Sequence, residues 1–257
     1  MLKIAENVYG IRTGISNVMI VTGLGPIKQD YVLIDAGIPF CGSYLQKELS
    51  KMVGEKAPLA IILTHGHFDH IGAIGHLFKS WNVPIYAHEQ ELPYLQGKKA
   101  YDPPHPFRIK GLLSFLSPFY PRDGIVITQN IIPLKTDEPI PHLDGWQMIH
   151  TPGHTEGHIS LFRKSDRLLL AGDAIITVKQ ESLLAVLQQK KELHGPPAYF
   201  TPNRAQAKQS IIKLAAYKPE ILYSGHGKPI KGSALDAGLK TLISQYEWEM
   251  EDAPTFS

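Results

Sequence analysis

Three histidines and one aspartate lie close together in the segment LTHGHFDHIG, residues 63–72. His65 and His67 are two positions apart, so in extended backbone both side chains point to the same side. Asp69 and His70 follow at the start of a helical pattern. Imidazole and carboxylate are the groups that bind a divalent metal ion such as zinc. Because polar groups at a strand end are costly to bury without partners, the spacing predicts a metal site.

Three later stretches offer further candidate ligands, each directly after an apolar strand pattern. His154 lies in TPGHTEGH after WQMIHT, Asp173 ends LLLAGD, and His226 lies in ILYSGHG. Glycine flanks each of them and allows the backbone to bend sharply beside a bulky ion. The candidate ligands therefore lie just after the carboxyl ends of the predicted strands, where ligand sites of layered α/β proteins are found.

The candidates outnumber the three or four ligands that one tetrahedral ion takes, so together they suit two ions. The ligands can be divided between two ions that lie about 3.5 to 4 Å apart and share a hydroxide. The carboxylate of Asp173 then lies between the two ions. Each ion then has a set of three ligands of its own: His65, His67 and His154 for the first, and Asp69, His70 and His226 for the second.

Strand and helix patterns alternate in both halves of the chain and must position these side chains. Helical spacing of apolar residues predicts helices over residues 69–81 and 201–217, with Thr201 as the N-cap of the second and Pro202 at its first position. The pattern predicts a layered α/β domain with helices on the outer faces of the sheets. The predicted strands are short apolar or alternating runs: NVMIVTG, YVLIDAG, LAIILTH, VPIYAH, GIVITQN, WQMIHT, HISLFRK, RLLLAGD and EILYSGHG.

Composition excludes several other classes of protein. The 257 residues are 43% hydrophobic with a formal charge of +2, and no block of like charge indicates a nucleic-acid or membrane partner. A single cysteine, Cys41, excludes an internal disulfide and a thiolate-rich metal site. Since the start of the chain lacks an apolar signal segment, we expect a cytoplasmic protein with one domain over residues 1–257 that acts on a small molecule.

The order H-x-H-x-D-H, then a histidine in PGHT, an aspartate in GD and a histidine in GHG, resembles the metallo-β-lactamase fold hydrolase superfamily. The matching motifs extend from about Asp35 in LIDAG to His226. This resemblance implies a four-layered αβ/βα sandwich, in which two mixed β-sheets face each other, helices lie outside and a dinuclear site opens at one edge. It also implies the same division of the ligands between two metal ions.

A hydrolytic mechanism follows from such a site. Two divalent ions would lower the pKa of a bridging water, so that a metal-bound hydroxide exists near pH 7. Asp69 is the expected catalytic residue, because it would orient the hydroxide and carry a proton to the leaving group. Zinc suits the histidine-rich set best, while iron, manganese and nickel also accept imidazole and carboxylate.

Differences from known members of this superfamily narrow the class of substrate that we expect. The aspartate in GDA, Asp173, is similar to that of glyoxalase II and the lactonases, whereas zinc β-lactamases use no such bridge. Long-type glyoxalase II has a glutathione-binding domain that the residues after His226 are too few to form. Acyl-homoserine lactonases have a tyrosine where this chain has Ile176. We therefore expect hydrolysis of an ester-like bond in a small molecule, such as a lactone, a thioester or a related acyl group.

Four alternatives remain for comparison. A phosphodiesterase is the first, and a mononuclear iron dioxygenase of the same fold, with fewer ligands, is the second. Flavin-dependent diiron proteins replace the second motif histidine with a carboxylate, so His67 favours hydrolysis over electron transfer. A degenerate binding module would lack ligands, and here each motif position is filled.

Some residues outside the ligand set are expected near the centre. Asp35, at the end of YVLID, would accept a hydrogen bond from a metal-binding histidine. His158 lies four residues after His154, but the site is already full, so a supporting position is expected rather than a ligand. His194 and Tyr199, in the loop ELHGPPAYFTP, are candidate substrate contacts.

The connection around residues 95–125 contains a segment rich in proline and aromatic residues, residues 101–124. Its apolar side chains predict either a helical lid over the metals or packing into the core or a homodimer interface. In the lid hypothesis, Phe115 and Phe119 contact an acyl or aromatic substrate.

Overall fold

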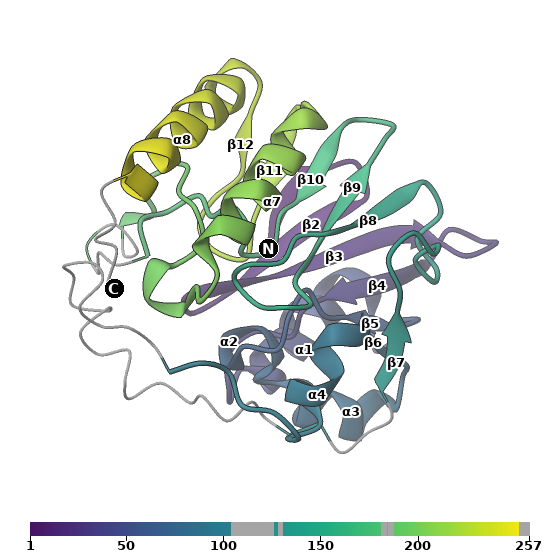
Figure 1. The fold of residues 1–257 in the computed structure, drawn as a ribbon. Coiled ribbons are helices and arrows are strands. Elements are labelled where there is room, and N and C mark those ends of the chain that lie inside the picture. Colours follow the sequence, from purple (N-terminus) through teal and green to yellow (C-terminus); the bar gives the residue numbers. More distant parts are fainter. Residues whose placement is uncertain (104–125, 128–130, 181–183, 185–187, 252–257) are drawn as a thin grey trace.

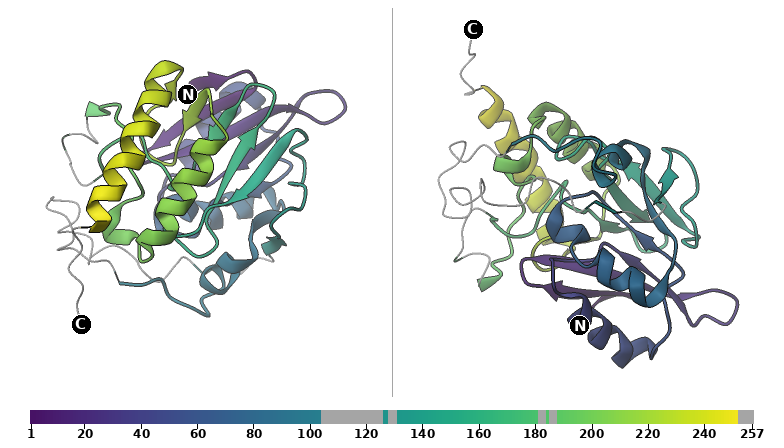
Figure 2. Two further views of the ribbon diagram at one scale, coloured as in Figure 1. Left: turned by 45° about the horizontal axis from the view of Figure 1, so that its top comes forward. Right: turned by 90° about the horizontal axis from the view of Figure 1, so that it is seen from below.

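The structure is a computed structural model, and it describes residues 1–103, 126–127, 131–180, 184 and 188–251 (Figure 1). Two β-sheets face each other, and helices cover their outer faces (Figures 1 and 2). This arrangement confirms the αβ/βα sandwich expected from the sequence. The predicted insertion around residues 95–125 lies mostly outside the described residues, as do Phe115 and Phe119. Within the part of the chain described, no helix is long and apolar enough to cross a membrane.

The larger sheet has seven strands in the order β1-β2-β3-β4-β5-β6-β7. Neighbours from β1 to β4 are antiparallel, and neighbours from β4 to β7 are parallel. The parallel strands end at one edge, where β4 and β5 lead into the candidate site. The strands are β1 (Leu2–Ala5), β2 (Val8–Thr13), β3 (Ser16–Leu24), β4 (Asp30–Ile34), β5 (Ile61–Ile62), β6 (Ile85–His88) and β7 (Ile131–Leu134).

The smaller sheet has five strands in the order β12-β11-β10-β9-β8, with only β10 and β11 parallel. Alternation along β10 shows how it divides two cores. Leu168 and Leu170 pack between the sheets, while Leu169 faces the helices. The strands are β8 (Trp146–His150), β9 (Ile159–Arg163), β10 (Leu168–Leu170), β11 (Ile221–Tyr223) and β12 (Ile230–Lys231).

Helices cover the two sheets on opposite sides of the sandwich, as the views in Figure 2 show. α1 (Gly42–Val53) and α3 (Ile74–Trp81) pack on the larger sheet through Leu45 and Leu77. α7 (Arg204–Ala216) and α8 (Ser233–Glu251) pack on the smaller sheet. The other helices of the described residues are short: α2 (Phe68–Ile71), α4 (Leu92–Leu95) and the 3-10 turns Glu89–Glu91 and Ala198–Phe200.

The helix predicted over residues 69–81 is divided into α2 and α3. The backbone N–H of Gly72 donates to Gly37 O at 2.7 Å instead of continuing the helix. A Cβ at Gly72 would lie 2.1 Å from the backbone nitrogen of Pro39, so the chain needs glycine there. The prediction of one continuous helix was therefore wrong, because the turn bonds to the loop after β4.

The prediction of Thr201 as the N-cap of the second helix was also wrong. Asn203 caps α7, and its side-chain oxygen accepts from Gln206 N at 3.0 Å. Thr201 Oγ1 instead donates to Pro197 O at 2.7 Å and lies 3.2 Å from His154 Nδ1. The hydroxyl that resembles a helix cap is thus used at the candidate metal site.

Candidate metal centre

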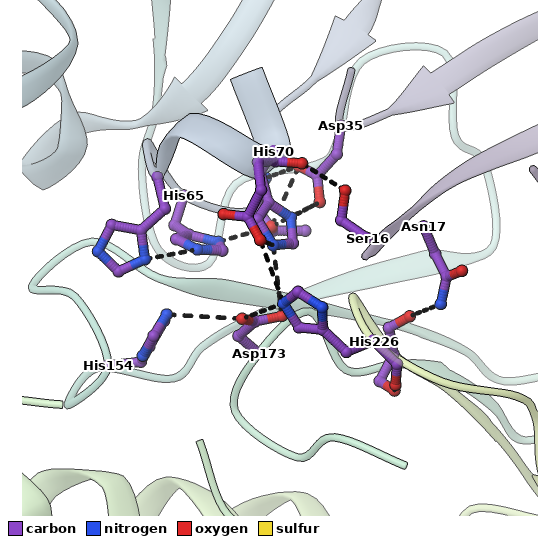
Figure 3. Close-up of polar contacts among 12 residues, drawn as sticks. Ser16, Asn17, Asp35, His65, His70, His154, Asp173 and His226 are labelled. Atoms are coloured by element: carbon purple, nitrogen blue, oxygen red, sulfur yellow. Dashed lines mark hydrogen bonds and ion pairs between the residues drawn. The ribbon is translucent and has the colours of Figure 1, made fainter. Parts of the chain in front are cut away.

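The candidate ligands gather at the edge where strands of both sheets end, on the loops that leave those strands. Figure 3 shows His65 and His70, which follow β5 of the larger sheet, facing His154, Asp173 and His226, which follow strands of the smaller sheet. The position of each follows from its strand or helix: His65 and His67 after β5, Asp69 and His70 on α2, His154 after β8, Asp173 after β10 and His226 after β11.

Their donor atoms form three overlapping groups, within each of which every ligand atom lies within 4.8 Å of the others. One group joins the two sets expected from the sequence, because it contains His65 of the first set, His70 of the second set and Asp173. Two of the groups contain the same residues as those expected sets. The groups are His65, His67 and His154; His65, His70 and Asp173; and Asp69, His70 and His226.

The carboxylate of Asp173 lies between the two sets. Asp173 Oδ2 is 3.0 Å from His226 Nε2 and 3.6 Å from His154 Nε2. Asp173 Oδ1 is 3.5 Å from His70 Nε2. The only other carboxylate in these groups, that of Asp69, lies to one side, with Oδ2 3.5 Å from His226 Nε2. Asp173 is therefore the carboxylate placed to serve both sets.

Burial and charge set the protonation of the histidines. Burial holds the pKa of His65 and of His154 well below the usual value, and it lowers the pKa of His67 to about 3. These rings are therefore neutral near pH 7, the form that binds a metal ion. The first set of ligands needs no proton removed before it can bind.

The second set has a different electrostatic balance. Burial, the largest single effect, would lower the pKa of His70 and His226, but the carboxylates of Asp173 and Asp69 together outweigh it, so the pKa of both histidines is raised. Burial would likewise raise the pKa of Asp173, yet His226 and His70 hold it well below the usual value. The side chains therefore favour an anionic Asp173, which can attract and bind a cation.

Unpartnered atoms test whether these residues fit a metal ion. His70 Nε2, His154 Nε2 and Asp173 Oδ1 are buried, and no atom of the described part of the chain is a hydrogen-bond partner for them. Leaving a buried polar atom without a partner costs about 1–3 kcal/mol, more when it is charged. Because nitrogen and oxygen donors converge here without partners, the residues fit divalent metal ions.

Hydrogen bonds behind the ligands fix their orientation. His70 Nδ1 lies 2.8 Å from Asp35 Oδ2, as expected for Asp35, and Thr64 N donates to Asp35 Oδ1 at 2.8 Å. Asp35 directly follows β4 and adopts a positive φ of 64°. Such partners direct the other ring nitrogen of a ligand histidine toward the metal.

His158 supports Asp173 rather than joining the ligands. Asp173 N donates to His158 Nε2 at 2.9 Å, so that ring nitrogen accepts and the hydrogen resides on Nδ1. His158 Nδ1 then donates to Thr151 Oγ1 at 2.8 Å. Both ring nitrogens are used, and His158 has none left for a metal ion.

The turn between β2 and β3 also supports the site, which no motif predicted. His226 Nδ1 lies 2.8 Å from Ile15 O, and Ser16 Oγ donates to Asp69 O. Asn17 Nδ2 donates to Ser224 O and Gly227 O, both at 2.9 Å, which anchors the loop of His226. The sequence Thr-Gly-Ile-Ser-Asn does not by itself indicate that this turn supports the site, because its hydrogen-bond partners are distant in the sequence.

A second feature that the motifs did not predict is Glu91, a fully buried carboxylate. Its Oε2 accepts from Gly66 N at 3.0 Å and from the hydroxyl of Tyr101. Its Oε1 accepts from Gly157 N at 2.9 Å and from Thr155 Oγ1. Glu91 therefore joins the loop that carries His65 and His67 to the loop that carries His154.

Replacement of Glu91 by glutamine is expected to destabilise the protein by about 2–4 kcal/mol. An amide has only one acceptor oxygen, so its NH₂ group would face two buried donors. Metal affinity is expected to fall roughly 10- to 100-fold, as for other groups that orient ligands. Chemical denaturation and competition with a chelator would measure the two effects. Glu89→Gln is the matched control, since Glu89 is exposed two residues away. Equal behaviour of both variants would contradict this role of Glu91.

A pocket opens above the ligands and is largely apolar. Tyr199, a candidate substrate contact from the sequence, lines it, and so does Gln180. His194 is not among the described residues that line it. His194 lines a separate groove along α8, because its backbone pairs with Ile176. The apolar wall consists of Ile15, Phe68, Tyr101, Pro197, Tyr199 and Phe200.

Comparison with known proteins assigns the chain to a family. Residues 11–226 match the model of the metallo-beta-lactamase superfamily. "Probable metallo-hydrolase YflN" of Bacillus subtilis (strain 168) is 48% identical over 242 residues, covering 94% of this chain and 91% of that protein. The metallo-beta-lactamase family protein TTHA1429 from Thermus thermophilus superposes with a TM-score of 0.68 at 19% identity, covering 97% of this chain and 82% of that one.

A further solved structure, TTHA1623 in a di-iron-bound form, has a TM-score of 0.58 and 24% identity, and the match covers 87% of this chain and 93% of that one. At this level of identity the likeness concerns the fold. The family model covers most of the chain, including every candidate ligand. The chain therefore belongs to the metallo-beta-lactamase superfamily and is a metal-dependent hydrolase.

Proposed function

We propose that the protein is a dinuclear hydrolase that cleaves an ester-like bond, in a lactone, a thioester or a related acyl group of a small molecule. The observation that carries this proposal is the Asp173 carboxylate between two sets of ligands. Two divalent ions bound there would supply a hydroxide near neutral pH. Zinc is the metal proposed, since most donors are imidazoles, and the di-iron form of TTHA1623 supports a pair of ions on this fold.

The chain itself supplies a proton acceptor beside the pocket. Asp69 lines the pocket and is slightly exposed, and its backbone oxygen is held by Ser16 Oγ. In this proposal the Asp69 carboxylate would accept a proton from the attacking water and deliver it to the leaving group. This role requires no serine or cysteine nucleophile.

The walls of the pocket favour an uncharged substrate. The described residues that line it include no lysine or arginine, and aromatic rings of Tyr101, Tyr199 and Phe200 form much of its surface. At the described walls, the negative charge of a phosphodiester would be offset by the metal ions alone, without an arginine partner. An acyl or lactone substrate would instead place its apolar part against the rings.

Metal analysis is expected to give close to two ions per chain for protein prepared without chelator. The seven candidate ligands motivate this number, since one tetrahedral ion takes three or four. Elemental analysis by mass spectrometry would measure it on fully loaded protein. Full occupancy at one ion would contradict the dinuclear proposal and favour a mononuclear iron dioxygenase of this fold.

A panel of lactones, thioesters and phosphodiesters would test the substrate class with the metal-loaded enzyme. We expect turnover of neutral acyl substrates and the highest kcat/KM for those with an apolar acyl part. Higher kcat/KM for phosphodiesters would overturn the acyl proposal. Oxygen consumption without hydrolysis would favour the dioxygenase.

A further inference from the structure

Gln180 is a buried amide beside the second set of ligands, and it belongs to no motif. Its side chain lines the pocket together with Asp69, Asp173 and His226. One end of the amide lies against His226, since Gln180 Nε2 is 3.2 Å from His226 Nδ1. The other end, Oε1, is buried and has no hydrogen-bond partner among the residues that the structure describes. A buried polar atom is usually hydrogen-bonded, so a ligand in the pocket is a candidate partner for this end of the amide.

The segment that carries Gln180 is held firmly to the loop of His226. Thr177 N and Thr177 Oγ1 both donate to His226 O, at 3.1 and 2.9 Å. Gly227 adopts a φ of 93°, and a Cβ there would lie 2.5 Å from Thr177 Oγ1, so the two segments are in close contact. Gln180 therefore keeps a defined position relative to His226.

Hydrogen-bond chemistry decides which end of the amide faces His226. His226 Nδ1 is 2.8 Å from Ile15 O, which can only accept, so this ring nitrogen carries a hydrogen. A ring nitrogen that carries a hydrogen cannot accept from an amide NH₂ group. The two ends of a carboxamide have nearly the same shape, and hydrogen-bond partners determine which is oxygen. The oxygen of Gln180 can share the hydrogen of His226 Nδ1 with Ile15 O, whereas the NH₂ group cannot donate to that nitrogen, so the oxygen faces His226 and the NH₂ group takes the other position.

We propose that Gln180 is a specificity-determining residue whose NH₂ group donates a hydrogen bond to an oxygen of the substrate, on the His226 side of the pocket. This inference rests on the proposed function, because an ester or lactone carries the required acceptor oxygen. The same donor would also bind a carboxylate, which is the product of such a hydrolysis. Substrates without an acceptor at this position would leave the buried NH₂ group unpaired and would bind less well.

Two variants separate the two ends of the amide. Gln180→Glu keeps an oxygen toward His226 Nδ1 and removes the donor, while Gln180→Met removes both. With metal content equal to wild type, we expect both variants to raise KM for a neutral ester substrate roughly 10- to 100-fold, with a smaller change in kcat. Gln147→Glu is the control, since Gln147 on β8 donates to Tyr217 away from the pocket. A wild-type KM in Gln180→Glu would overturn the proposal.

Acetate binding gives a readout that does not depend on turnover. Calorimetric titration of zinc-loaded protein with acetate should show affinity reduced about tenfold or more in Gln180→Met, which adds no charge. If wild type hydrolyses no ester but binds acetate more tightly than Gln180→Met, the proposed function fails and the role of Gln180 stands. If esters are hydrolysed and Gln180→Met binds acetate as wild type does, the role of Gln180 fails alone.

Discussion

Replacement of Asp173 by alanine is expected to lower turnover roughly a thousandfold, because a divalent ion contributes several kcal/mol to the transition state. Among the described residues, Asp173 is the carboxylate within contact distance of ligands from both sets. Without it, the second set keeps His70 and His226 with only Asp69 as an anion. We expect one bound ion to be lost and the other retained, measured by elemental analysis beside steady-state kinetics.

The fold is expected to persist in this variant, since the three cores do not include Asp173. Asp166→Ala is the matched control. Asp166 pairs with Arg163 in the turn between β9 and β10, with no ligand among its partners. Two bound ions and unchanged hydrolysis in Asp173→Ala would show that another group joins the sets.

A single methyl group at Gly225 is expected to disable the centre almost as strongly. A Cβ there would lie 2.1 Å from Asp173 Oδ1 and 2.6 Å from His70 Cε1, so both ligands must move. Displacement of reacting groups by about 1 Å can cost a hundredfold in rate, and we expect at least this loss for Gly225→Ala. Gly225 does not have a positive φ, so alanine strains no backbone angle there.

Metal content and kcat would measure the effect of Gly225→Ala. Gly75→Ala is its control: Gly75 is exposed on α3, and a Cβ there meets nothing within 4 Å. Alanine in a helix is favoured over glycine by about 1 kcal/mol, so this control should be slightly more stable and fully active. Wild-type activity of Gly225→Ala would mean that Asp173 does not occupy the position described.

Local patterns account for what could be predicted. His65 and His67 are adjacent to a buried strand, and their spacing alone directs them to one side. The alternation of apolar residues predicted the layered sheets in the same way, because residues two positions apart lie on the same face of a strand. Prediction was poorer where a contact joins distant segments. Glu91 looks like its exposed neighbour Glu89 in sequence, and only the fold brings Gly66 and Gly157 to its carboxylate.

The positions of some strands and helix ends also depend on contacts with residues that are distant in the sequence. β7 contains Pro133 and does not match an alternating pattern, yet its residues pair with β6. Helix α2 ends where Gly72 bonds to Gly37, thirty-five positions earlier in the chain. The orientation of the Gln180 amide likewise depends on Ile15, because the Ile15 carbonyl places the hydrogen on His226 Nδ1. Such constraints follow from tertiary contacts rather than from residue type.

The bonds of Asn17 to the loop of His226 have a consequence for biosynthesis. Asn17 lies near the start of the chain, and its partners Ser224 and Gly227 lie more than two hundred positions later. A nascent chain could pair β2 with β3 early, but the second ligand set would stay incomplete until the last histidine left the ribosome. Loading with metal should therefore follow synthesis of nearly the whole chain, and partial chains should bind the ion weakly.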